Sequence, residues 1–543
     1  MSASSKKKLR KEQESAKLTE QQLSARKEAR KLNLYTIIFV AVMAVLLVVA
    51  VTVGVSKSIA GSGIREKKTT ALTVADHKLS SVELNYFYMD VVNQFAQQYG
   101  SYAMFLGLDT TKPLDEQVQD PETGATWADN FLESAKEQAK AVYAMTDAAA
   151  AAGFTLSDEE IASVEANVSN MEAFAKLYGY ADADAYLKAM YGPGSSKDSF
   201  LAYSKLLTLA NAYHNSYATG LTYQDADLRA VDAEKPETYS TFSYNAYYLA
   251  ASRFLEGGTT DDEGNTTYSD EEKAASVAAA EAAAKALTGE EIVDVATLDA
   301  AIAALDVNKD TEDAASTASE TLYTSISDLY ADWLADSSRK AGDVAYFAST
   351  STDAEGNETV NGYQVVMFQS VNDNTFALPN VRHILVAFEG GTKDENTGVT
   401  TYTEEEKAAA KAEAEQVLSQ WQSGDATEES FAALANEKSD DGNGTTGGLY
   451  ENIVPGQMVV NFNDWCFESG RKAGDTGIVE TEYGYHVMYF VGDSEYTYRD
   501  YMIENELRSA DTQAWYNSIV DPVTVTEGST KYIRRNLVLS QGQ

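Results

Sequence analysis

The sequence is poor in the residues that build disulfides and metal sites. It has one cysteine, Cys466, in 543 residues, so an internal disulfide is excluded, and it has no Cys–His cluster for zinc. It also has only four histidines and seven prolines. Basic residues are scarce as well, with 42 Lys and Arg against 83 Asp and Glu. This acidic balance argues against nucleic-acid binding, because such binding needs cations to neutralise phosphates.

The basic residues are unevenly placed. Residues 1–33 hold ten Lys or Arg and four Asp or Glu, whereas the other 510 residues hold 32 basic and 79 acidic side chains. Residues 34–55 follow without any charge, and 22 uncharged, mostly apolar residues are enough to cross a hydrocarbon core of about 30 Å. We therefore expect a single-pass membrane anchor with a cytoplasmic N-terminus and the bulk of the chain outside the cytoplasm. The alternative is a signal peptide cleaved after Ala60.

Helical patterns dominate the next part of the chain. Residues 56–78 are predicted to be a linker. Residues 79–235 place apolar and aromatic side chains three and four positions apart, which predicts an all-α domain of about five helices. One helix start is marked by Ser157 and Glu160, a capping box.

The remainder contains an internal repeat. Asp-Trp, five residues, then Arg-Lys-Ala-Gly-Asp occurs at 332–343 and again 132 residues later, at 464–475. "GYQVVMF" at 362–368 recurs as "GYHVMYF" at 484–490. We infer two copies of one α/β module, residues 239–372 and 379–493, each starting and ending in a strand. The acidic loops in both copies lack the ligand spacing of an EF-hand, so we predict solvated turns and no metal.

The two copies differ in their histidines. In the second copy, His383 and His486 interrupt two otherwise apolar strands, and we predict that they face each other. In the first copy, Gln364 stands in the place of His486, and either Ala246 or Ala250 stands in the place of His383. The first copy therefore retains the fold without the site chemistry.

The second copy resembles the parvulin-type peptidyl-prolyl isomerases. The resemblance rests on "VRHILV", "SDD", "GGL", "GQMV" with Phe462, and "TEYGYH", in that order. An anchor, a helical region and two such modules further resemble the PrsA foldases and the SurA-type chaperones. The resemblance implies that the catalytic residues are His383, His486, Asp440, Asp441 and Thr481. Of the two aspartates, Asp441 is the nearer match. The resemblance also implies that the proline ring is bound by Leu449, Met458, Phe462 and Phe467.

The implied function is an extracytoplasmic isomerase that assists the folding of secreted proteins. Its partners would be unfolded or folding polypeptides with X–Pro bonds, and the family needs no cofactor. The main alternative is a non-catalytic holdase that binds unfolded secreted chains. A solute-binding protein is a third possibility, which the repeat does not support.

A further helix is predicted at 496–520, followed by a tail at 521–543. Its aromatic residues need a covering surface, and the helices of 79–230 offer one. The predicted fold class is thus multidomain α+β. It comprises a transmembrane helix, an all-α chaperone-like domain completed by the C-terminal helix, and two parvulin-like modules with antiparallel sheets.

Overall fold

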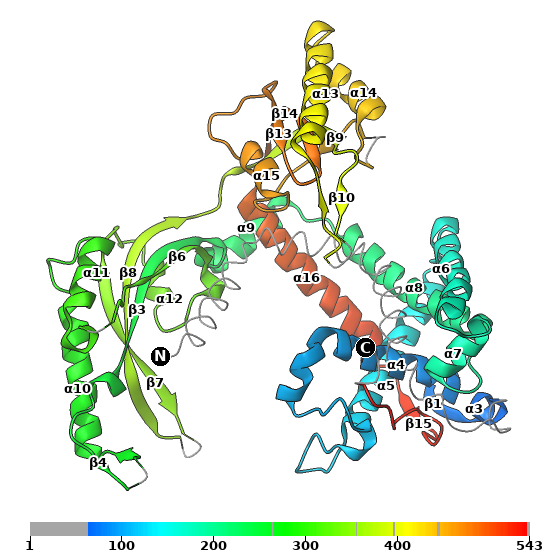
Figure 1. Cartoon of the computed structure of the whole chain (residues 1–543), viewed down its shortest axis with the longest axis horizontal. Helices are drawn as coiled ribbons and strands as arrows, with labels where there is room; N and C mark the ends of the chain where they lie inside the picture. Colours follow the sequence, from blue (N-terminus) through cyan, green and yellow to red (C-terminus); the bar gives the residue numbers. More distant parts are fainter. Residues whose placement is uncertain are drawn as a thin grey trace. The chain divides into compact units, whose positions relative to one another are not determined.

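The computed structural model describes residues 63–539, apart from 263, 310, 354–355, 395–396 and 443–445. The predicted basic segment and the predicted anchor at 34–55 lie outside the described residues. Within the described part, no helix is both long and apolar enough to cross a membrane. The described chain divides into two compact units, one formed by 63–222 with 506–539 and the other by 223–505 (Figure 1).

The first unit is mainly helical. Its long helices are α4 (Ser81–Tyr99), α5 (Trp127–Ala151), α6 (Asp158–Leu177), α7 (Ala183–Tyr191) and α8 (Lys197–Gly220). Capping boxes at Ser80, Thr126, Ser157 and Ser196 start four of them, since each hydroxyl accepts a backbone N–H that the helix leaves unpaired. The core of the unit is aromatic and includes Tyr86 and Phe87.

The predicted linker and tail are partly wrong, because both contain strands of the helical unit. Strands β1 (Thr70–Val74), β2 (His77–Ser80) and β15 (Val525–Glu527) form a sheet in the order β15-β1-β2. The strand β1 buries Leu72 and Val74, and the C-terminal segment buries Ile533 and Leu537. These segments are short and polar by composition, so their few apolar residues carried too weak a pattern to predict burial.

The helix α16 (Tyr498–Val520) contributes to both units. Its residues 506–520 belong to the helical unit, where Trp515 stacks on Tyr217 of α8 with ring centroids 4.0 Å apart. Arg508 of α16 also donates to the carbonyl of Leu221 at 2.9 Å. The preceding turns, from Tyr498, belong to the other unit.

The two repeats have the same sheet topology. In the first, β3 (Thr241–Ala250), β6 (Ser316–Leu322), β7 (Val344–Thr352) and β8 (Glu358–Asn372) are ordered β6-β3-β8-β7. In the second, β9 (Ala377–Ala387), β12 (Leu449–Tyr450), β13 (Thr476–Glu480) and β14 (Gly484–Thr497) are ordered β12-β9-β14-β13. All of these pairs are antiparallel.

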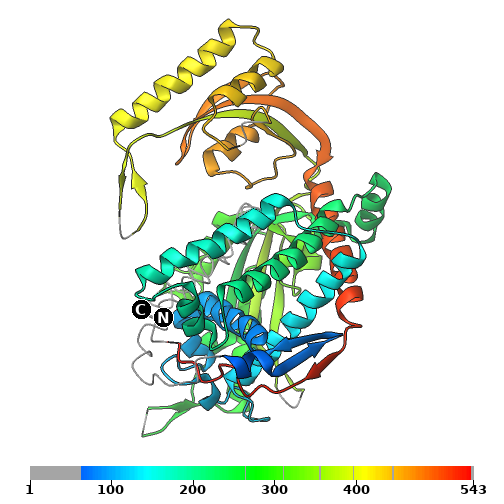
Figure 2. The ribbon, with the colours of Figure 1, turned by 90° about the vertical axis from the view of Figure 1, so that its right-hand side faces the viewer.

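Helices cover both faces of the second sheet. Helices α13 (Glu404–Ser423) and α14 (Glu428–Lys438) pack on the face that carries Ile384 and Val487 (Figure 2). The short helix α15 (Val460–Cys466) packs on the opposite face with Val381 and Met488. In the first repeat, α10 (Asp270–Ala286) and α11 (Val295–Ala304) correspond to the first pair, and α12 (Ala331–Ala335) corresponds to α15.

The repeated Asp-Trp…Arg-Lys-Ala-Gly-Asp motif builds the same turn in both repeats. The guanidinium carbon of Arg471 lies 3.7 Å from the ring centroid of Trp465, and that of Arg339 lies 5.0 Å from that of Trp333. The final aspartate of each motif accepts the backbone N–H of its lysine, at 2.8 Å in the second repeat and 3.0 Å in the first. The motif therefore holds the start of a strand.

Candidate active site

His383 and His486 lie side by side on neighbouring strands. In the register of β9 and β14, His383 pairs with Met488 and His486 pairs with Leu385, so the two imidazoles occupy one face of the sheet. Their Nδ1 atoms are 3.1 Å apart, and the residues are 2% and 6% exposed. Since a hydrogen bond needs one donor and one acceptor, at least one of the two Nδ1 atoms is unprotonated.

Two more side chains extend this pair into a chain of polar contacts. Thr481 Oγ1 lies 2.9 Å from His486 Nε2, and Asp441 Oδ2 lies 2.9 Å from His383 Nε2. The Asp441 contact is close in distance but is not aligned as a hydrogen bond. With both imidazoles neutral and a proton of His383 Nε2 facing Asp441, the contacts fit one arrangement of protons: Thr481 donates to His486 Nε2, and His486 donates from Nδ1 to His383 Nδ1.

The electrostatics favour a neutral His486. Burial, aided by the neighbouring His383, lowers the pKa of His486 to about 3. The contact with His383 lowers the pKa of Asp441, so this carboxyl is ionised at neutral pH. The result is a buried, hydrogen-bonded floor with one carboxylate at its edge. No side chain of this group is an activated nucleophile.

Aromatic side chains cover the floor. The ring of Phe462 on α15 stands edge-on to both imidazoles, with centroids 5.3 Å from each. The ring of Tyr450 lies 5.2 Å from that of His383, and its hydroxyl donates to Asp441 at 3.2 Å. Met458 is partly buried in the same apolar cluster. Apolar and aromatic side chains beside paired imidazoles are the kind of surface that contacts a proline ring.

Comparison with known proteins identifies this module. The family model described as "Rotamase: PPIC-type PPIASE domain" matches residues 383–492. Residues 383–492 are a parvulin domain. Among solved structures, the chain is similar to the peptidylprolyl isomerase PrsA from Bacillus cereus, with 25% identity and a TM-score of 0.17. That match covers 28% of this chain and 50% of the PrsA chain. The comparison with curated proteins finds no match.

The structure does not place every expected residue beside the histidine pair. Leu449 pairs with Arg382 and Tyr450 pairs with Val381, so Tyr450 lies on the face of His383 and Leu449 lies on the opposite face. The side chain of Asp440 accepts the backbone N–H of Ala387 at 2.9 Å instead of facing the histidines. Phe467 lies at the edge of the apolar cluster, where its ring contacts Phe376.

Sequence reasoning missed Tyr450. The strand β12 is two residues long, so the alternation of side chains within it does not show which of the two faces the site. Only its register against β9 decides which side chain faces the site. A tyrosine directly after "GGL" was the available signal.

The first repeat lacks both histidines, and the sheet register shows which alanine replaces His383. Gln364 of β8 pairs with Tyr248, and Val366 pairs with Ala246. In the parvulin domain the corresponding pairs are His486 with Leu385 and Met488 with His383. Ala246 therefore occupies the position of His383, and Ala250 is excluded because it pairs with Gly362.

Proposed function

We propose that this protein is a membrane-anchored, extracytoplasmic peptidyl-prolyl cis-trans isomerase that assists the folding of secreted proteins. The observation that carries the catalytic part is the buried His383–His486 pair beneath Phe462 and Tyr450 in a parvulin domain. The anchor and the location rest on the charge pattern of residues 1–33 and the uncharged run at 34–55.

The reaction requires rotation about an X–Pro amide bond. Amide resonance sets a barrier of about 18–20 kcal/mol, so uncatalysed isomerisation is slow enough to limit folding. The twisted transition state has less C–N double-bond character than either planar form. A site that binds the twisted form best accelerates the rotation without any covalent step.

The geometry of the site suits this task. The cup formed by Phe462, Tyr450 and Met458 would hold the proline ring and exclude water from the amide. The polar chain from Thr481 to Asp441 fixes the tautomers of both histidines and so fixes the shape of the floor. An acceleration of about 10³ needs only about 4 kcal/mol of differential stabilisation, which such contacts can supply.

The expected clients are unfolded or folding polypeptides that contain X–Pro bonds. The loop after β9, residues 389–398, holds a single lysine and three acidic residues. It therefore offers no basic cluster for a phosphate, and we expect no preference for phosphorylated Ser–Pro or Thr–Pro bonds.

Truncation of Met458 tests the catalytic assignment. In the full chain, Met458→Ala should lower isomerisation of a proline tetrapeptide at least tenfold, because it opens the cup while leaving the fold within a few kcal/mol. The control is Leu418→Ala, which removes a partly buried side chain on the opposite face of the sheet. Equal activities of the two variants would contradict the assignment.

The same assay tests the division of labour between the repeats. A chain that carries Met458→Ala and Phe462→Ala together should retain no isomerisation, because the first repeat has Ala246 and Gln364 in place of the histidines. Residual catalysis close to that of the unchanged chain would place activity in the first repeat.

A holdase function is supported by a separate observation. The 3-10 helix η2 (Gly100–Leu106) exposes four large apolar side chains, those of Tyr102, Met104, Phe105 and Leu106. The most exposed is Phe105, at 87%. Exposed apolar segments bind other apolar surfaces. If the protein is a holdase, suppression of aggregation of an unfolded protein should survive Met458→Ala and fall when Phe105 and Met104 are both changed to Ser.

A further inference from the structure

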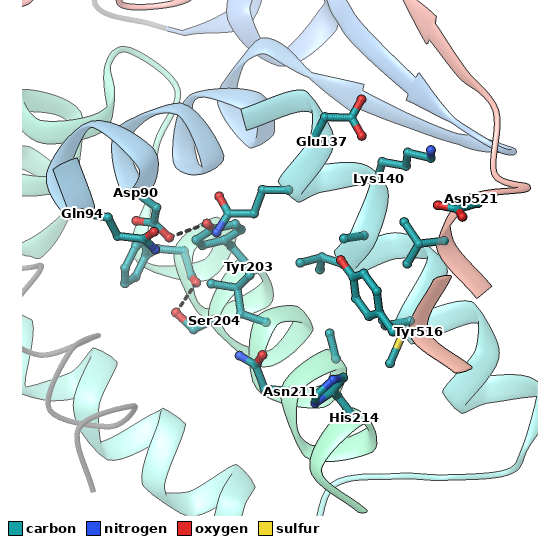
Figure 3. Close-up of a pocket in the computed structure, with 18 of the residues that line it drawn as sticks. Asp90, Gln94, Glu137, Lys140, Tyr203, Ser204, Asn211, His214, Tyr516 and Asp521 are labelled. Carbon is teal, nitrogen blue, oxygen red and sulfur yellow. Dashed lines mark hydrogen bonds between the residues drawn. The ribbon is translucent and has the colours of Figure 1, made fainter. Parts of the chain in front are cut away.

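The helical unit contains a cavity of about 650 Å³ (Figure 3). It lies between α4, α5 and α8, and the end of α16 with Asp521 completes its wall. Cavities of this size accommodate small ligands or a side chain with its stem. The cavity belongs to a different unit from the parvulin site.

One part of the cavity presents hydrogen-bond acceptors. The Tyr203 hydroxyl donates to Asp90 Oδ2 at 2.5 Å, and no Lys or Arg within the described residues forms an ion pair with Asp90. Asp90 lines the cavity and is half-buried, and burial raises the pKa of this carboxyl to about 7. Gln138 Oε1, on the cavity lining, is buried without a hydrogen-bond partner among the described residues.

The remaining lining adds negative charge and aromatic surface. Glu137 and Asp521 also line the cavity, together with Lys140 and His214, so the lining carries three carboxyl groups, one ammonium group and one imidazole (Figure 3). Tyr191, Phe200 and Tyr516 contribute ring surface. Aromatic faces attract organic cations, and they also pack against aliphatic stems.

We propose that this cavity binds an ammonium or guanidinium group carried on an apolar stem, with Asp90 and Gln138 as its acceptors. An anion is disfavoured because the carboxyl groups of the lining would repel it. An apolar ligand would leave Gln138 Oε1 unpaired and would give Asp90 no partner besides the Tyr203 hydroxyl. A metal ion is disfavoured because no group of three or more His, Cys, Asp or Glu within the described chain is placed to hold one. The cation can be a free amine or a Lys or Arg side chain of a polypeptide.

Calorimetric titration of the full chain tests the proposal with two matched pairs of ligands. The first pair is n-pentylamine and n-pentanol, and the second is a ten-residue peptide with a central lysine and the same peptide with norleucine. We expect the charged member of at least one pair to bind at least tenfold more tightly. Asp90→Asn should remove that difference, and Glu159→Gln, an exposed acid outside the cavity lining, should preserve it.

A second variant guards against misfolding of the first. Gln138→Leu removes the unpaired acceptor and should weaken the charged ligand several-fold, with the thermal midpoint and the tetrapeptide activity unchanged. Binding of the amine alone would identify a free cation, and binding of the lysine peptide alone would identify a polypeptide. Equal binding of charged and neutral members in both pairs, or unchanged affinity in Asp90→Asn, would overturn the proposal.

Discussion

At the scale of single residues, the site depends on which side chains share a face. His383 and His486 do so because β9 and β14 place them one diagonal step apart, and the Nδ1 contact follows from that register. Their identity could be predicted because histidine is rare in this sequence and both examples interrupt apolar strands. The resemblance favoured Asp441 over Asp440 but did not decide between them, because the choice depends on a turn whose direction the sequence does not encode locally.

The register of β12 against β9, which places Tyr450 and not Leu449 on the face of His383, leads to a prediction at this scale. Tyr450→Ala should reduce tetrapeptide isomerisation about tenfold or more, because it removes one wall of the cup and the hydroxyl that contacts Asp441. Leu449→Ala, one position away on the opposite face, should change the rate less than twofold. Steady-state rates of the two variants decide the matter, and the reverse order would show that Leu449 lines the site.

The buried His486 should make the parvulin domain sensitive to acid. Its pKa is about 3 in the folded domain, against an ordinary value of about 6.5. Between these values the unfolded chain binds a proton that the folded domain does not bind. Stability that is present above pH 6.5 is therefore lost as the pH falls toward 3. Asp441, whose pKa is also lowered, adds a loss in the same direction at lower pH.

Hydrogen exchange of the β9 and β14 amides at pH 7 and pH 5 measures this loss. We expect the opening free energy to fall on acidification in the unchanged chain and to fall less in His486→Gln. An imidazole carbon shift of His486 that titrates near pH 6.5 would contradict the assignment of a neutral buried ring.

At the scale of elements, the repeat shows that a turn built by residues close together in the sequence can be recognised from the sequence. The turn built by Trp465, Arg471 and Gly474 recurs with Trp333, Arg339 and Gly342, and its residues are close enough in sequence for the motif to be recognised. The long strands and helices were predictable from periodicity for the same reason. Strands β1, β12 and β15 were not, because each has five residues or fewer and depends on pairing with distant segments.

The two turn glycines provide a matched experiment. Both have φ of 91°, where a side chain strains the backbone by about 1–2 kcal/mol. A Cβ on Gly342 would also lie 2.3 Å from the carbonyl oxygen of Val293, whereas a Cβ on Gly474 meets nothing within 4 Å. Gly342→Ala should therefore destabilise its repeat more than Gly474→Ala destabilises the parvulin domain.

Amide exchange reports both effects within one protein. The amide of Phe368 bonds to Asp343 in the first repeat, and that of Phe490 bonds to Asp475 in the second. Faster exchange at Phe368 in Gly342→Ala than at Phe490 in Gly474→Ala is expected. Equal effects would mean that the loop carrying Val293 moves aside at no cost.

At the scale of the whole molecule, the C-terminal segment belongs to the helical unit. Beyond α16 the chain pairs β15 with β1, and it buries Ile533 and Leu537 in the aromatic core. Asn85 of α4 donates to the carbonyl of Tyr532 at 3.0 Å and accepts the amide of Arg534 at 2.9 Å. The helical unit is thus built from both ends of the described chain. Residues 223–230 and 496–505, which the sequence-based prediction placed in the helical domain, belong to the other unit.

Truncation after Val520 tests the contribution of this segment. Burial of Ile533 and Leu537 contributes about 1.5–3 kcal/mol each. Loss of Glu527 would also leave the buried Lys136 with Glu133 as its remaining ion-pair partner. We expect the helical unit to melt at a clearly lower temperature, while tetrapeptide isomerisation by the parvulin domain stays within twofold. Truncation after Leu539 serves as the control and should change neither. An unchanged melting transition after removal of 521–543 would show that the helical unit is stable without its C-terminal strand, and a parallel loss of isomerase activity would show that the two units do not fold independently.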